Sequence, residues 1–406
     1  MKSLILKNIG QLVTFDSAAD KLKIYNHTDL ALNNGLIQKI GPGLNGPGPE
    51  IDCRSCLVTP GFIDPHTHPV FMAGREGEFL QRLKGISYEE IAQKGGGIKA
   101  SIQGVRQCSE AELEKKVRKR MDRFLRLGTT TVEAKSGYGL DLDSELKSLR
   151  ILNRINNSHA LDIISTFMGA HAFPPEFEQD HNGYIDLICE KMIPAVAAEN
   201  LAQFCDVFCE KGYFNVDQCR RIFNTAQKYG LETRLHADEF MDSKAAELAA
   251  ELGAVSADHL MAVSEQGLKA LSRSNVIATL LPGTTFFLGL STYAPAGEFL
   301  RNGIKIALAT DYNPGSSHIQ SMPFIISLAC IKMGMTVEEA FISATFNSAR
   351  ALRLEKTVGS LEIGKQGDMI VWDLEKLSEI PYYVADSPIN TVIKNGEILF
   401  RLDSPE

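Results

Sequence analysis

Short runs of apolar and β-branched residues alternate with amphipathic segments along the middle of the chain. Each run predicts a strand, because β-branched residues are typical of strands. The eight runs cover residues 57–63, 129–132, 162–168, 206–208, 232–235, 255–257, 275–281 and 305–309. Amphipathic segments predict helices at 110–127, 144–156 and 242–252, the last with Asp242 as its N-cap. Eight strands with intervening helices predict an α/β fold, a TIM-like (β/α)8 barrel.

The two ends of the chain carry a different pattern, with short β-type runs and no long helical period. These runs lie at 3–15 and 30–40 at one end, and at 368–372 and 391–394 at the other. Asn395-Gly396 is a strong hairpin signal. Strands from both ends can pair into one small domain. The predicted domains are a β-sandwich from residues 1–57 and 359–406, and a barrel over residues 58–358.

Net charge and the length of apolar runs disfavour two classes of partner, nucleic acids and membranes. The formal net charge of −8 disfavours nucleic-acid binding, because phosphate groups need a basic surface. No apolar run reaches the roughly 18–20 residues that a membrane span requires. Lys7 interrupts the first apolar stretch too early for a signal peptide. We therefore expect a cytoplasmic protein without a nucleic-acid or membrane partner.

The eight cysteines predict reduced thiols, which are the rule in that compartment. Cys53 and Cys56 form a C-x-x-C pair, and a redox role is the alternative to two thiols in a turn. No second pair at zinc-ribbon spacing accompanies them. Cys205 and Cys209 are expected to be core residues beside a strand.

Histidines and carboxylates gather directly after the predicted strands, where the active sites of such barrels are built. Six of the nine histidines lie there or in the loop after the last run: His66, His68, His171, His236, His259 and His318. His66 and His68 point the same way because the period of a strand is two. Two converging imidazoles favour a metal site over purely structural hydrogen bonds. Adding His236 and Asp311 gives three nitrogens and one carboxylate, which suits zinc or ferrous iron.

Three more residues suggest chemistry beside that metal. Glu239 is either a helix-start carboxylate or a general acid/base. His259 is placed to orient a water or to stabilise charge on a carbonyl oxygen. Arg75 is either a bidentate clamp for a carboxylate or a solvated surface charge. The Gly95-Gly96-Gly97 segment lacks the Lys-Ser/Thr pair of a phosphate loop and predicts a flexible loop over the barrel mouth.

Several segments resemble the amidohydrolase superfamily. Its first-strand signature matches PGFIDPHTH at 60–68, and its return to the β domain matches VGSLEIGKQGD at 358–368. Within it, the chain resembles most the imidazolonepropionase family. The segments that carry this resemblance are FMAGRE (71–76), KSGYGL (135–140), MGAHA (168–172), LHADEF (235–240), LPGTTFFL (281–288) and ATDYNPGS (309–316). The similarity covers nearly the whole chain.

The resemblance implies a fold, a reaction and a set of site residues. It implies a (β/α)8 barrel with a small β-sandwich, one zinc or iron(II) ion per chain, and a homodimer. The implied reaction is hydrolytic ring opening of 4-imidazolone-5-propanoate to N-formimidoyl-L-glutamate in histidine degradation. The implied metal ligands are His66, His68, His236 and Asp311. The implied substrate contacts are Arg75, Tyr138, His171, Glu239, Asn313, Gly315 and Ser316. The implied catalytic groups are Glu239, His259 and Asp311.

Two other functions remain open from the sequence. A deaminase of cytosine or guanine type shares the His-x-His, His-x-x-Glu and Asp set and differs on the substrate side. A non-catalytic barrel scaffold is expected to lack several ligands, whereas this chain keeps all four. Dinuclear relatives carry a carbamylated lysine after the fourth strand, and the sequence leaves open whether Lys211 or Glu210 approaches the metal.

Overall fold

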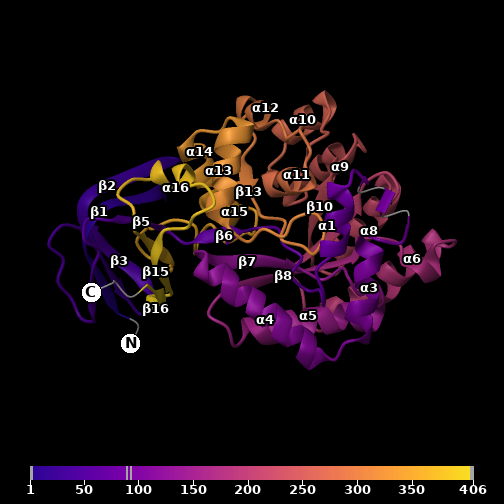
Figure 1. Cartoon of the computed structure of the whole chain (residues 1–406), viewed down its shortest axis with the longest axis horizontal. Coiled ribbons are helices and arrows are strands. Elements are labelled where there is room, and N and C mark those ends of the chain that lie inside the picture. Colours follow the sequence, from indigo (N-terminus) through magenta and orange to yellow (C-terminus); the bar gives the residue numbers. More distant parts are fainter. Residues whose placement is uncertain (1–2, 88–89, 92–93, 403–406) are drawn as a thin grey trace.

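The computed structural model describes residues 3–87, 90–91 and 94–402. Its larger part is a parallel eight-stranded sheet wrapped into a nearly closed barrel, with helices around it (Figure 1). The barrel strands follow one another in chain order. They are β6 (Phe62–Asp64), β7 (Thr129–Lys135), β8 (Asp162–Ala170), β9 (Phe204–Cys209), β10 (Glu232–Ala237), β11 (Ser256–His259), β12 (Ile277–Leu280) and β13 (Ile306–Leu308). The predicted (β/α)8 fold is confirmed.

Hydrogen bonds just beyond the first and last strands close the ring. The His68 amide donates to the Tyr312 carbonyl at 2.8 Å, and the Asp311 amide donates to the His66 carbonyl at 3.1 Å. The buried Asp64 carboxylate adds to this seam by accepting from the Thr310 amide at 3.1 Å and from its hydroxyl at 2.5 Å. Closure therefore fixes the residues after β6 against those after β13.

Helices cover the outside of the barrel, and further helices follow the last barrel strand. Those from the first half are α1 (Glu76–Leu83), α3 (Ile98–Gln107), α4 (Glu110–Arg126), α5 (Leu142–Asn156), α6 (His181–Leu187), a π turn (Ile188–Met192) and α7 (Ile193–Ala198). The others are α8 (Val216–Lys228), α9 (Ala245–Leu252), α10 (Glu265–Ser272), α11 (Pro282–Leu288), α12 (Ala296–Arg301), α13 (Met322–Met333), α14 (Val337–Ser343), α15 (Phe346–Arg350) and α16 (Glu379–Tyr382). No helix among the described residues is long and apolar enough to cross a membrane.

Two helices show how local sequence sets the boundaries. Ser109 and Glu112 form a reciprocal capping box at the start of α4, close to the predicted start of that helix. The prediction of Asp242 as the N-cap of α9 is wrong. That helix begins at Ala245, and Asp238 accepts from the amides of Ala245 and Ala246 at 3.1 Å. Asp238 follows β10 directly, so the barrel strand carries its carboxylate to the helix start.

The two termini meet in a second sheet of eight strands, in which indigo and yellow strands lie side by side (Figure 1). Its path runs β16-β15-β14-β5-β1-β2-β3, and β4 pairs with β1 off this path. The strands are β1 (Leu4–Asp16), β2 (Lys21–Asn33), β3 (Leu36–Gly41), β4 (Glu50–Asp52), β5 (Leu57–Pro60), β14 (Met369–Trp372), β15 (Ile389–Lys394) and β16 (Glu397–Arg401). The predicted Asn395-Gly396 turn joins β15 to β16.

The apolar run at 57–63, predicted as one strand, is divided between the two sheets. β5 pairs with β1 and β14, whereas β6 pairs with β7. Gly61 lies at the crossing, where an added Cβ would come within 2.4 Å of the Thr130 side chain. β5 crosses the proposed domain boundary at 57/58; that boundary and the one at 358/359 stay predictions.

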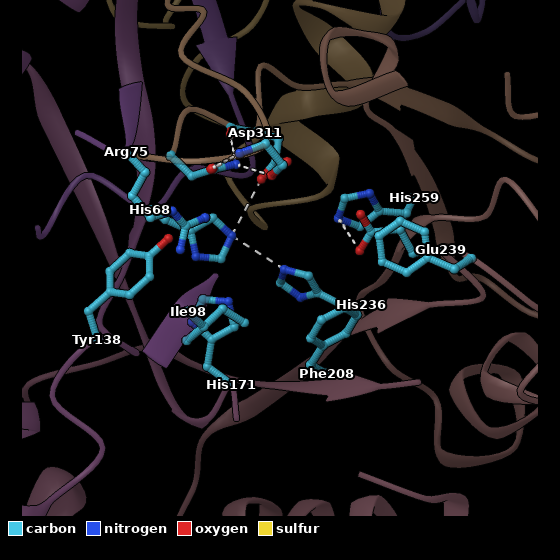
Figure 2. A pocket seen from close by; sticks show the side chains of 13 residues that line it. His68, Arg75, Ile98, Tyr138, His171, Phe208, His236, Glu239, His259 and Asp311 are labelled. Atoms are coloured by element: carbon cyan, nitrogen blue, oxygen red, sulfur yellow. Dashed lines mark hydrogen bonds and ion pairs between the residues drawn. The ribbon is translucent and has the colours of Figure 1, made fainter. Parts of the chain in front are cut away.

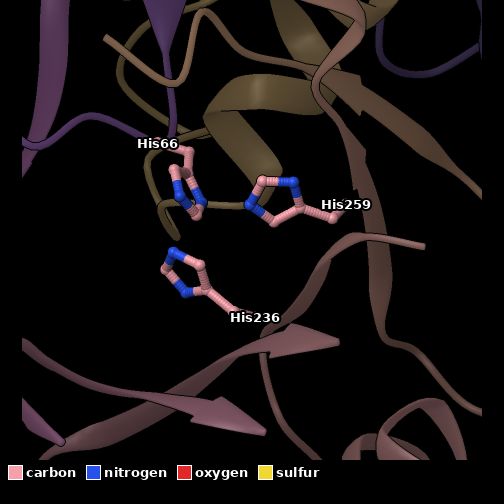
Figure 3. A group of neighbouring side chains, drawn as sticks. All are labelled: His66, His236 and His259. Atoms are coloured by element: carbon pink, nitrogen blue, oxygen red, sulfur yellow. The ribbon is translucent and has the colours of Figure 1, made fainter. Parts of the chain in front are cut away.

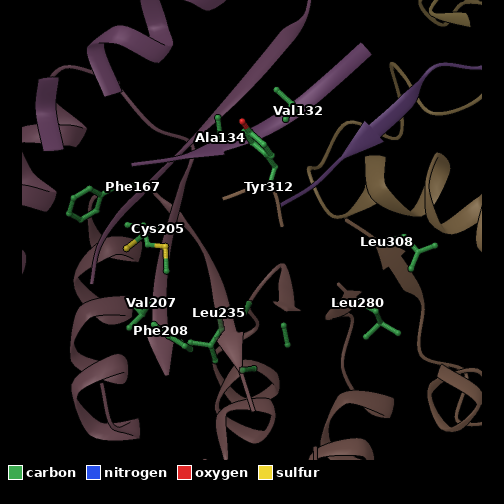
Figure 4. Packing of buried hydrophobic residues seen from close by; sticks show 14 of the residues in the cluster. Val132, Ala134, Phe167, Cys205, Val207, Phe208, Leu235, Leu280, Leu308 and Tyr312 are labelled. Carbon is green, nitrogen blue, oxygen red and sulfur yellow. The ribbon is translucent and has the colours of Figure 1, made fainter. Parts of the chain in front are cut away.

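The main hydrophobic core fills the barrel and includes residues of the terminal sheet such as Ile370 and Trp372, and a second, smaller core belongs to the terminal sheet. In the barrel, buried side chains from successive strands pack together, among them Val132, Phe167, Val207, Leu235 and Leu280 (Figure 4). All eight cysteines lie within the described residues as free thiols, and Cys205 and Cys209 are buried in β9 as expected. Burial raises the pKa of the Cys53 thiol to about 12. A thiol of that pKa is inert, which disfavours a redox role for the C-x-x-C pair.

Candidate active site

The four predicted metal ligands converge at the carboxyl ends of the barrel strands. The Nε2 atom of His68 lies 3.2 Å from that of His66. It lies 3.3 Å from that of His236 (Figure 2). The Oδ1 atom of Asp311 lies 3.5 Å from Nε2 of His68 and 3.7 Å from Nε2 of His66. All four side chains are buried. Three imidazole nitrogens and one carboxylate oxygen thus face a common centre.

Carboxylates from two other barrel strands fix the orientation of two of these rings. His66 donates from Nδ1 to Asp258 at 2.6 Å, and His236 donates from Nδ1 to Asp206 at 2.9 Å. The proton on Nδ1 leaves the Nε2 lone pair of each ring directed at the centre. Thr284 likewise donates to Oδ2 of Asp311 at 2.5 Å, which leaves Oδ1 directed inward.

The cluster fits a divalent metal ion. Burial lowers the pKa of His66 and of His68 well below the ordinary value, so both rings are neutral. Lone pairs on the Nε2 atoms of His66 and His68, 3.2 Å apart, repel one another unless a cation lies between them. Ligand atoms at 2.0–2.1 Å from one tetrahedral ion lie about 3.3 Å apart, which matches this spacing. The donor set is that of zinc or iron rather than magnesium or calcium.

Two buried cations hold the supporting carboxylates. Nζ of Lys135 lies 2.8 Å from Oδ2 of Asp206 and 2.8 Å from Oε1 of Glu133. On the opposite flank, Arg234 contacts Asp258 at 3.2 Å. The contacts form two chains, Lys135–Asp206–His236 and Arg234–Asp258–His66. The cations, the carboxylates and the imidazole rings in both chains are all buried. They satisfy charges that would be costly to bury alone.

Asp206, Lys135 and Arg234 were not predicted as site residues. Each lies in a buried barrel strand, and a charged residue in such a strand is the signal that could have found them. Their partners lie on other strands, so spacing along the chain does not reveal the contacts.

Glu239 and His259 lie together on the other side of the centre. Nε2 of His259 is 3.7 Å from Oε2 of Glu239 (Figure 2). Burial raises the pKa of Glu239 well above its ordinary value, and the negative charges of Asp311 and Glu210 add to the shift. Ligating atoms of His259, His66 and His236 lie within 4.8 Å of one another (Figure 3). A buried carboxyl group with a raised pKa therefore borders the His/Asp cluster.

Arg75 is buried, so the surface-charge interpretation is wrong. It precedes α1, and its Nε lies 3.4 Å from Oε2 of Glu78 on the first turn of that helix. Gly315 lies against the guanidinium, where an added Cβ would come within 1.6 Å of Nη2. Glu78 also accepts from the Gly97 amide at 2.9 Å, which ties the glycine segment to this group. That segment leads into α3, whose first residue, Ile98, reaches the cavity.

The loop that carries Asn313 is held by its own side chain. Oδ1 of Asn313 accepts from the amides of Gly315 and Ser316 at 2.8 and 2.7 Å. Its Nδ2 donates to the Asp311 carbonyl at 2.7 Å and to the Ser316 hydroxyl at 2.8 Å. The loop therefore fixes Asp311 and Gly315 relative to each other.

One cavity brings nearly all the predicted site residues together. Its lining residues are His68, Arg75, Ile98, Tyr138, His171, Phe208, His236, Glu239, Phe240, His259, Asp311, Asn313 and Ser316. His66 lies beneath the cavity as a ligand of the cluster, and Gly315 lies behind Arg75 in an adjoining one. The apolar walls Ile98, Phe208 and Phe240 were missed, because apolar residues carry no signal of their own.

Three further residues near the site lie outside this cavity. His318 lines the adjoining cavity and contacts the Asn313 carbonyl at 3.2 Å. Glu210 accepts from the Phe240 amide at 2.9 Å, and Lys211 is exposed.

Comparison with known proteins places the chain in a family. Residues 57–399 match the amidohydrolase family. The chain is 45% identical to an imidazolonepropionase from Shouchella clausii, over 98% of this chain and 92% of that protein. It is 44% identical to one from Geobacillus thermodenitrificans, over 98% of both.

Solved structures share the fold at low identity. A 5-methylcytosine deaminase from Klebsiella pneumoniae superposes with a TM-score of 0.73 at 19% identity, over 100% of this chain and 99% of that one. A mutant atrazine chlorohydrolase from Arthrobacter aurescens, complexed with zinc, gives 0.71 at 15% identity, over 98% and 95% of the two chains. These similarities concern the fold alone, whereas the full-length relatives above confirm the resemblance seen in the motifs. The chain belongs to the imidazolonepropionase family of the amidohydrolases.

Proposed function

We propose that this chain hydrolyses 4-imidazolone-5-propanoate to N-formimidoyl-L-glutamate, a step of histidine degradation. The observation that carries the proposal is a buried arginine in the same cavity as the His/Asp cluster and Glu239. The substrate has a ring amide to open and a carboxylate tail to bind. Arg75 can pair with that tail in two parallel hydrogen bonds. The full-length imidazolonepropionase relatives support the same activity.

We propose His66, His68, His236 and Asp311 as the ligands of one zinc or iron(II) ion. Such an ion lowers the pKa of water toward about 7 and polarises a carbonyl oxygen. The chain's own residues prepare the site for it, because Asp258 and Asp206 hold the His66 and His236 rings with Nε2 inward. From the resemblance, we also propose that the protein is a cytoplasmic homodimer.

Glu239 is proposed to move the proton that ring opening requires. It takes a proton from the attacking water and delivers it to the ring nitrogen as the carbon–nitrogen bond breaks. Its raised pKa suits both halves of that transfer. His259, 3.7 Å away, is placed to hold the attacking water or the carbonyl oxygen. Tyr138 and His171 line the cavity beside His68, where they can contact the substrate. The His171 ring donates to the Gly137 carbonyl at 2.8 Å, which fixes its plane.

The metal content tests the ligand assignment. Purified protein is expected to hold one zinc or iron per chain by elemental analysis. His236→Ala should hold less than about a tenth of that amount, because it removes one of four ligands. His181→Ala is the matched control, since His181 is exposed on α6, and it should keep full occupancy. Two tightly bound ions per chain would contradict the single-metal assignment.

The activity itself separates the proposal from its rivals. Loss of imidazolonepropanoate absorbance, with N-formimidoyl-L-glutamate formed and no ammonia released, is the expected outcome. A deaminase would instead release ammonia from cytosine or guanine and leave imidazolonepropanoate intact. A scaffold protein would do neither. The fully assembled donor set disfavours the scaffold, and the buried Arg75 disfavours the deaminase, whose substrate has no carboxylate.

A further inference from the structure

Glu210 is a buried carboxylate that has been given no direct step in the chemistry above. It directly follows β9 and is 3% exposed. It accepts three hydrogen bonds. Its Oε2 accepts from the Phe240 amide at 2.9 Å, and its Oε1 accepts from the Ser243 hydroxyl at 2.8 Å and the Lys211 amide at 3.0 Å. Two of these three donors belong to the segment that follows Glu239.

These bonds fix the position of the segment 239–243 from a neighbouring strand. β9 and β10 pair in parallel, with Cys209 opposite Ala237. Glu210 therefore reaches across from the end of β9 to the residues after β10. On the other side of Glu239, Asp238 accepts from the amides of Ser243 and Ala245 at 2.9 and 3.1 Å. Both neighbours of Glu239 in the chain are therefore anchored. Phe240 donates its amide to the buried Glu210, and Asp238 is itself a buried carboxylate that binds the amides of Ser243 and Ala245.

We propose that Glu210 is a positioning residue that holds Glu239 in its catalytic place through the Phe240 amide and the Ser243 hydroxyl. The inference rests on the function proposed above, because it gives Glu239 the role of proton carrier. Phe240 comes directly after Glu239, so its amide belongs to the same peptide unit as the Glu239 carbonyl. The hydrogen bond between the Phe240 amide and the Glu210 carboxylate therefore fixes the backbone to which the Glu239 side chain is attached.

A metal-ligand role for Glu210 does not account for these contacts. Both of its oxygens are engaged by the segment after β10 and by its own neighbour. Among the described residues, Glu210 is also outside every His/Asp/Glu group whose ligating atoms lie close enough to hold an ion. Neither Glu210 nor the exposed Lys211 is therefore required to complete the cluster.

The test compares three single variants and the wild type by kcat and KM for imidazolonepropanoate. Glu210→Ala removes all three hydrogen bonds and is expected to lower kcat by about 10- to 100-fold, because proton transfer depends steeply on geometry. KM should stay within about threefold, since no substrate contact is lost. Glu210→Gln should raise kcat at least about threefold above that of Glu210→Ala. Its amide oxygen can accept from the Phe240 amide and its NH2 group can donate to the Ser243 hydroxyl, although the charge that helps to raise the pKa of Glu239 is lost. Asp242→Asn, which removes an exposed charge from the same segment, should stay within about twofold.

Hydrogen exchange gives a second readout that does not need turnover. The Phe240 amide should exchange at least about tenfold faster in Glu210→Ala than in wild type or Glu210→Gln, because it loses its acceptor. If Glu210→Ala does not fold, Ser243→Ala removes one of the two bonds and should lower kcat by about threefold at unchanged KM.

Two outcomes overturn the proposal. One is a kcat for Glu210→Ala, or for Ser243→Ala where the former does not fold, equal to that of Asp242→Asn. The other is a loss that Glu210→Gln does not reduce. A wild type that does not turn over imidazolonepropanoate would refute the proposed function instead, and the exchange rates would still report whether Glu210 holds the segment.

Discussion

Glu239→Gln is expected to lower turnover by roughly 10²–10⁴-fold, because the amide keeps the shape of the side chain but cannot carry a proton. The metal content should not change, since Glu239 is not among the four proposed ligands. KM should change little, because the substrate's carboxylate is held at the far side of the cavity by Arg75. Steady-state kinetics and elemental analysis of the same preparation measure both quantities.

A matched variant separates loss of the proton carrier from loss of charge. Glu251→Gln removes a carboxylate from α9, where it is exposed and paired with Arg220, and should leave turnover unchanged. If Glu239→Gln kept turnover within a few-fold of wild type, the buried carboxyl group would be structural. The proton would then have to move through His259, the nearest other titratable group to it.

Arg75→Ala is expected to raise KM for imidazolonepropanoate by about 10- to 100-fold. Hydrogen bonds to charged groups contribute about 1.5–3 kcal/mol, and each 1.4 kcal/mol is tenfold in affinity. Arg75→Lys should restore KM only in part, because an ammonium cannot make two parallel bonds to a carboxylate. Metal content should not change in either variant.

A substrate analogue without the carboxylate provides the control. If Arg75 binds the tail, a 5-alkyl imidazolone should be a poor substrate for wild type and no worse for Arg75→Ala. Gly315→Ala gives an independent approach, because its Cβ would displace the guanidinium. It should raise KM for imidazolonepropanoate, because it moves the arginine that binds the carboxylate. Unchanged KM in all three variants would remove the case for an anionic substrate.

The metal cluster could be predicted from the sequence because strand geometry is local. His66 and His68 are two residues apart, so they share a face, and both follow an apolar run. In a parallel barrel, the carboxyl ends of all strands meet at one rim, which brings His236 and Asp311 to the same place. The two-residue period of a strand and the position of each residue after its strand were therefore sufficient to predict the cluster, without any distance between the residues.

The hydrophobic pattern did not predict some elements, because these elements depend on contacts with residues far away in the sequence. Residues 21–27 begin β2 but are mostly exposed, so they lack the apolar alternation of a half-buried strand. They are strand because β1 pairs with them along their length. The run at 57–63 looked continuous because both of its halves are buried, although each half belongs to a different sheet.

The amino-acid sequence by itself determined the barrel, its terminal sheet and the identity of the proposed ligands, since these follow from periodicity and from which residues follow each strand. Only the tertiary structure decided how those groups are held. The pairs Lys135–Asp206 and Arg234–Asp258 join residues on different strands, and Arg75 is buried because Gly315 leaves space for it. Contacts of this kind depend on distances between segments far apart in the chain, and burial then sets the charge each group carries.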